Sequence, residues 1–79
     1  MVTICALYKF ARLDDFESMQ QPLKDFMSSV DARGTILLAK EGINGTICGS
    51  QNAIVRILAF LAADGRLGVI EHKLSYSEE

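Results

Sequence analysis

The first ten residues alternate along the chain with the period of a β-strand. One face of this strand is fully apolar and carries Val2, Ile4, Ala6, Tyr8 and Phe10. The other face is partly apolar and carries Thr3, Cys5, Leu7 and Lys9. A strand that is apolar on both faces is typical of the centre of a sheet, and we expect the fully apolar face to lie against the core.

Helical spacing replaces this alternation after the strand. The apolar stripe consists of Phe16, Met19, Leu23, Phe26, Met27 and Val30. Asp14 or Asp15 can cap the start of the helix. The stripe continues across Pro22, so we expect one helix with a local irregularity there rather than a start near Gln20. We expect Gly34 to end this helix in a left-handed conformation.

A turn-rich segment, residues 40–45, separates two short strand-forming runs, residues 35–39 and 46–48. Glycine and asparagine reach positive φ at low cost, so the pattern predicts a β-hairpin. The chain is expected to reverse between Lys40 and Gly45, where two turns compete: Glu41-Gly42 and Asn44-Gly45. Glycines this close together indicate either a constrained turn or a close approach of another chain or a ligand to the backbone.

A second helix and a last strand follow the hairpin. Residues 49–52 supply a turn and a cap, and the helical stripe consists of Ile54, Ile57, Leu58 and Leu61. Asp64-Gly65-Arg66 is expected to end this helix. Residues 69–76 alternate between a polar and an apolar face, as in a half-buried strand. The apolar face carries Ile70, His72, Leu74 and Tyr76.

The resulting order is strand, helix, strand, strand, helix, strand, which predicts an α+β, ferredoxin-like fold. Residues 1–79 form a single domain in this interpretation. Right-handed crossovers place the strands in the spatial order four-one-three-two, with both helices on one face of an antiparallel sheet. The other face is left uncovered, and Cys5, Leu7 and alternate residues of 35–39 are expected to lie partly exposed there. Such a patch indicates a partner, either another domain or a second copy of the chain.

Composition narrows the classes of function. The chain has 79 residues, of which 49% are apolar and 23% charged, so it is globular and long enough for one domain. A self-sufficient nucleic-acid binder usually carries a basic excess, and this chain, with a net charge of −2, does not. A local basic patch could still form from Lys9, Arg12, Lys40 and Arg56.

Neither a disulfide scaffold nor a zinc site fits two cysteines and one histidine. The start, Met1-Val-Thr-Ile, lacks the basic n-region typical of a signal peptide, and no apolar run approaches the about 20 residues that span a membrane. We therefore expect no membrane contact, a location in the reducing cytoplasm, and no metal or cofactor in this domain.

Ferredoxin-like domains serve many functions, so the residues must distinguish between three kinds of site. An RNA-recognition module needs exposed aromatic residues on the two central strands. The third strand has none, and Tyr8 and Phe10 are assigned to the core face. A metal or nucleophile site could use Cys5, Cys48 and His72. The two cysteines are expected on adjacent strands and on the same face. Nothing nearby lowers a thiol pKa.

The third kind of site is that of an acylphosphatase, which has the same order of elements. It requires an arginine in a phosphate-binding loop after the first strand and an asparagine that orients water. Arg12 and Asn44 are available. However, the loop at Arg12 contains no glycine, and Asn44 is assigned to the hairpin instead of to a strand.

A family resemblance is carried by the run Glu41-Gly42-Ile43-Asn44-Gly45-Thr46, with Gly34 to Ala39 before it and Gly49 after it. Further matching residues are Ala6 to Phe10, Pro22-Leu23, Ala59-Phe60-Leu61, Asp64 and Arg66. Over nearly its whole length the chain resembles the rhodanese-domain tRNA uridine hydroxylases. That family forms 5-hydroxyuridine at the wobble position of tRNA with molecular oxygen.

The resemblance implies an N-terminal domain that lacks the rhodanese domain, which holds the family's active-site cysteine. The catalytic role is therefore not carried over to Cys5 or Cys48, and no catalytic residue is expected. Expected partners are tRNA and the rhodanese domain. The binding or interface residues are predicted to be Lys40, Glu41, Gly42, Asn44, Gly45 and Thr46. The competing hypothesis is a scaffold that packs on a neighbour or forms a homo-oligomer through the open sheet face, in which a charge at Leu7 would disrupt assembly.

Overall fold

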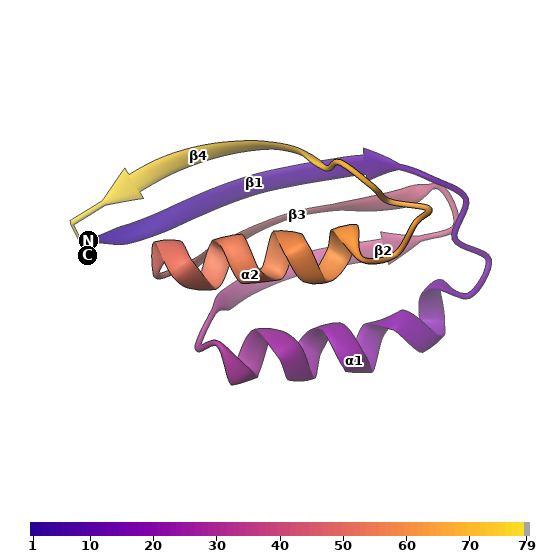
Figure 1. Ribbon diagram of the computed structural model, residues 1–79, viewed down its shortest axis with the longest axis horizontal. Coiled ribbons are helices and arrows are strands. Elements are labelled where there is room, and N and C mark those ends of the chain that lie inside the picture. The colour runs from indigo at the N-terminus through magenta and orange to yellow at the C-terminus, as the bar shows by residue number, and fades with distance from the viewer. Residues whose placement is uncertain (79) are drawn as a thin grey trace.

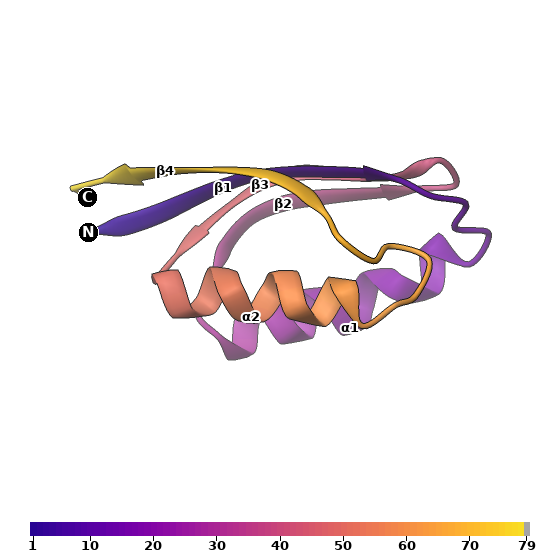
Figure 2. The same ribbon diagram turned by 45° about the horizontal axis from the view of Figure 1, so that its top comes forward.

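A computed structural model of the protein describes residues 1–78 as one sheet with two helices on one of its faces (Figures 1 and 2). The strands are β1 (Val2–Phe10), β2 (Arg33–Ala39), β3 (Gly42–Gly49) and β4 (Glu71–Ser77). The helices are α1 (Phe16–Ser29) and α2 (Gln51–Ala62). Every strand pair is antiparallel, and the sheet has the order β2-β3-β1-β4. The predicted ferredoxin-like fold and its strand order are confirmed.

Both helices begin and end close to the predicted positions. The Ser50 side chain accepts a hydrogen bond from the Ala53 N–H at 3.0 Å, which caps α2. Helix α1 runs through Pro22, as the continuous stripe indicated. The prediction that Gly34 ends α1 in a left-handed conformation was wrong. Asp31, with a φ of 58°, is the left-handed residue after α1, and Gly34 lies inside β2. Neither helix in the described part of the chain is long and apolar enough to cross a membrane.

The core lies between the helices and the two central strands, β1 and β3. Its residues from the helices are Leu23, Met27, Ala53, Ile54, Ile57 and Leu61, and all of them except Ala53 lie on the predicted stripes. Connecting segments contribute three further buried residues, Leu13, Leu67 and Ile70, of which periodicity indicated only Ile70. The loops therefore complete the core of this small domain.

The two faces of β1 are the reverse of the sequence prediction. Cys5 and Leu7 are buried at 0% and 3% exposure, whereas Tyr8 and Phe10 are 49% and 80% exposed. Pairing with β3 explains the reversal, because Cys5 lies opposite the buried Ile47 and cross-strand partners share a face. In β1 itself both faces are rich in apolar residues, so alternation could not identify the buried one.

Strand β4 was also expected to be half-buried, and this was wrong. Residues 71–76 are exposed on both faces of the strand. Among the described residues, β4 approaches β1 but neither helix, and Figure 1 shows it at the edge of the sheet away from α1 and α2. Of the residues on the predicted apolar face of this segment, only Ile70 is buried in the core, and it lies just before β4 begins.

Candidate functional site

The hairpin reverses at Lys40 and Glu41, inside the predicted segment. Ala39 of β2 pairs with Gly42 of β3, which leaves a two-residue turn between them. Asn44 is therefore not in a turn. It lies in β3, directly opposite Tyr8 of β1.

The turn is tied to the connection between β1 and α1. The Ala11 N–H donates to the Glu41 carbonyl and the Leu13 N–H to the Lys40 carbonyl, each at 2.9 Å. These two amides are directed at the hairpin and so do not form an anion-binding loop. The side chain of Arg12 is 86% exposed and pairs with Asp14 at 3.4 Å. The connection thus lacks the phosphate-binding arrangement that an acylphosphatase site needs.

Two of the predicted interface residues, Gly42 and Gly45, have a role inside the sheet. Gly42 has a φ of 141°, and a Cβ placed on it would lie 2.0 Å from the carbonyl oxygen of Lys9. A Cβ on Gly45 would lie 2.1 Å from the carbonyl oxygen of Thr35. The close approach that two neighbouring glycines predicted is therefore made by strands of this chain.

The other predicted interface residues, Lys40, Glu41, Asn44 and Thr46, are all exposed. Glu41 and Asn44 help to line a pocket of about 210 Å³ where the hairpin meets the open face of the sheet. Tyr8 and Phe10 line the same pocket. The alternation along β1 assigned these two aromatic residues to the core. The pairing of β1 with β3 is the signal that identifies them as exposed.

The structure separates the two cysteines of the proposed metal or nucleophile site. Cys5 and Cys48 lie on adjacent strands but on opposite faces, since Cys5 pairs with Ile47 and Cys48 pairs with Ile4. Burial raises the pKa of the Cys5 thiol, which makes it a poor nucleophile. Within residues 1–78, no three His, Cys, Asp or Glu residues gather in a way that could hold a metal ion.

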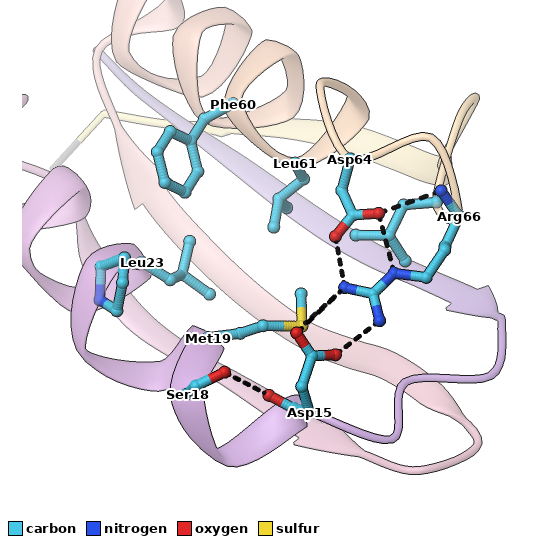
Figure 3. Close-up of a pocket in the computed structure, with 10 residues that line it drawn as sticks. Asp15, Ser18, Met19, Leu23, Phe60, Leu61, Asp64 and Arg66 are labelled. Atoms are coloured by element: carbon cyan, nitrogen blue, oxygen red, sulfur yellow. Dashed lines mark hydrogen bonds and ion pairs between the residues drawn. The ribbon is translucent and has the colours of Figure 1, made fainter.

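A second pocket lies between the ends of the two helices and is bordered by an ion-pair cluster (Figure 3). It has a volume of about 270 Å³ and a mainly apolar wall that includes Met19, Leu23, Phe60 and Leu61. At its rim, Arg66 pairs with Asp64 at 2.6 Å and with Asp15. Arg66 thereby links the loop after α2 to the start of α1.

Hydrogen bonds from Arg66 hold the pKa of Asp64 at about 2, below the ordinary value of 3.8, and they also lower the pKa of Asp15. Both carboxylates already neutralise the guanidinium of Arg66, so this cluster is best described as a structural clamp between the helices.

The clamp should make stability depend on pH. A carboxyl whose folded pKa is depressed stabilises the fold above its unfolded pKa and loses that contribution as pH falls through the folded pKa. For Asp64 this interval runs from about 3.8 down to about 2. Arg66→Gln is expected to lower the melting temperature at neutral pH by roughly 1–8 °C, as for exposed ion pairs. The difference from the unmodified protein should shrink toward zero as pH falls through this interval.

Thermal unfolding followed by circular dichroism at several pH values would measure this effect. Lys24→Gln is the matched control, since Lys24 is an exposed cation on α1 outside the cluster. A difference between Arg66→Gln and the unmodified protein that stays constant down to pH 2 would contradict the role of the clamp.

Comparison with known proteins gives one family match and a similar solved structure. Residues 2–79 match the family described as UPF0176 acylphosphatase like domain. Among solved structures, the chain is similar to the de novo designed protein Ferredog-Diesel, with a TM-score of 0.57 and 13% identity over 94% of this chain and 84% of that chain. At this identity the likeness concerns the fold alone.

Proposed function

Because this chain belongs to the family of UPF0176 acylphosphatase like domains, we propose that it is the N-terminal accessory domain of an enzyme that hydroxylates the wobble uridine of tRNA. In this proposal a rhodanese domain carries the reactive cysteine. The present domain packs beside it and helps to position tRNA, without a catalytic residue of its own. It acts in the reducing cytoplasm, in keeping with the free thiols of Cys5 and Cys48.

The observation that carries the proposal is the location of the run from Glu41 to Thr46, the part of the chain with the most specific family resemblance. The hairpin brings Glu41 and Asn44 of this run to the open sheet face, beside Tyr8 and Phe10. Both helices lie on the opposite face, so a large partner has access to these side chains (Figure 2).

The charge of the chain supports an accessory role. Affinity for nucleic acid comes mainly from cations that neutralise phosphates, and this chain has a net charge of −2. In the proposal, other parts of the protein supply the phosphate contacts. The open face then contributes to the positioning of tRNA and to the selectivity for it.

Hydroxylation of tRNA by the full-length protein tests the proposal. Glu41→Gln and Asn44→Ala are each expected to lower the rate by about 5- to 10-fold, since each removes polar contacts worth roughly one hydrogen bond. The measurement is the amount of 5-hydroxyuridine formed in purified tRNA over time, by mass spectrometry. Glu17→Gln and Asn52→Ala are matched controls, because they change exposed residues of the same types on the helices.

Normal hydroxylation by folded Glu41→Gln and Asn44→Ala proteins would overturn the proposal. It would favour the scaffold hypothesis, in which the domain only stabilises its neighbour or forms a homo-oligomer through the open face. Light scattering of the purified chain would then report the oligomeric state directly.

A further inference from the structure

The open sheet face carries an exposed aromatic pair on a central strand. Tyr8 and Phe10 project from β1 on the side away from the helices, with 49% and 80% of their surfaces exposed. Their ring centroids are 5.8 Å apart at an interplanar angle of 63°. Because the rings are not parallel, a flat ligand can stack on the face of one ring and meet the edge of the other.

Groups that can form hydrogen bonds lie around the two rings. Asn44 faces Tyr8 across the β1–β3 pairing, and Glu41 lines the same pocket. An amide side chain both donates and accepts hydrogen bonds, and a carboxylate accepts them. A planar ligand with donors and acceptors around its edge, such as a nucleobase, matches this set of groups.

Polar and charged residues flank β1 on the open face, although the exposed Leu37 of β2 lies opposite Asn44 on the same face. Glu71 lies opposite Tyr8 in β4, and Lys73 and Thr46 flank Ala6 in the neighbouring row. Ala6 and these three neighbours on β3 and β4 are all exposed. Charged residues are depleted from the cores of protein interfaces, whereas nucleic-acid platforms combine aromatic rings with polar edges. The observations therefore favour a base over a second copy of the chain.

We infer that Tyr8 and Phe10 form a stacking platform for an unpaired nucleobase of RNA, and that Asn44 contacts the edge of that base. The inference depends on the proposed function only for the choice of RNA as the ligand. Since Glu41 and Glu71 border the platform, the phosphate backbone does not run across it. Binding at the platform should consequently depend less on salt than ordinary RNA binding does.

Binding of a fluorescein-labelled single-stranded oligouridine to the 79-residue chain, followed by anisotropy, tests the inference. Tyr8→Val and Phe10→Val keep strand-forming residues at exposed positions, so the fold should be preserved; circular dichroism checks this. Each is expected to weaken binding by about 5- to 150-fold, the range for loss of one stacked base. Tyr8→Phe should bind nearly normally, because it keeps the ring.

Tyr76→Val is the matched control. Tyr76 is a tyrosine of similar exposure, 54%, on the edge strand β4, and its pairing with Thr3 places it on the other face of the sheet. The Tyr76→Val chain should bind oligouridine as tightly as the unmodified chain does. A duplex of oligouridine with oligoadenine should bind much more weakly, since its bases are not free to stack on protein rings.

Four results would overturn the inference: no binding of the single strand, unchanged binding by Tyr8→Val and Phe10→Val, equal weakening by Tyr76→Val, or equal binding of the duplex. A dimer that Tyr8→Val dissociates would instead identify a second copy as the occupant of the face. The assay involves no hydroxylation, so it separates the two proposals. Ring-dependent binding with normal hydroxylation by the hairpin variants would leave the platform standing and overturn only the proposed function.

Discussion

Gly42→Ala is expected to unfold the protein or leave it barely folded. The new Cβ would lie 2.0 Å from the carbonyl oxygen of Lys9 and 3.0 Å from the amide nitrogen of Ala11, both of which are backbone atoms that cannot swing away. The φ of 141° adds strain for any residue with a side chain. We expect a cost of about 4 kcal/mol or more, against a total stability of about 4–12 kcal/mol for a domain of this size.

Two other glycines separate the causes of this effect. Gly68 has a φ of 53° with open space around its Cβ position, so Gly68→Ala tests conformational strain alone and should cost about 1–2 kcal/mol. Gly65 has open space and no positive φ, and Gly65→Ala should change stability by less than about 0.5 kcal/mol. Urea unfolding of the three variants measures the order of their stabilities. Equal stability of the Gly42 and Gly65 variants would show that the strands can part at the hairpin without cost.

Leu7→Asp is the second change with a large expected effect. Leu7 is 3% exposed and lies on the helix-covered face of β1, so the substitution both removes core packing and places a carboxylate in an apolar environment. We expect a loss of about 4 kcal/mol or more, which would leave the chain largely unfolded. Circular dichroism and urea unfolding would measure it.

Ala6→Asp is the control on the same strand. Ala6 is exposed on the open face, where Lys73 is its neighbour in β4, and the change should cost within about 1 kcal/mol. A folded Leu7→Asp protein together with an unfolded Ala6→Asp protein would mean that the faces of β1 are those the sequence predicted. The expected result also corrects the scaffold hypothesis, since a charge at Leu7 damages the fold itself rather than only an assembly through the open face.

The candidate site was predictable in part. Glycine and asparagine marked the hairpin, and its turn lies inside the predicted segment at Lys40 and Glu41. The platform residues Tyr8 and Phe10 were not predicted. Apolar residues occupy both faces of β1, and a large aromatic residue in such a strand is ordinarily buried, so local pattern favoured the wrong side.

The pattern of residues along the chain was enough to predict the elements and their order, because helix and strand periodicities depend on near neighbours in the chain. Those periods, with short connections and right-handed crossovers, were enough to establish the ferredoxin-like sheet. Three features became clear only from the folded chain: which face of β1 is buried, that β4 contacts neither helix, and that the loop residues Leu13 and Leu67 close the core. Each of these depends on contacts between distant parts of the chain, above all the register that places Cys5 opposite Ile47.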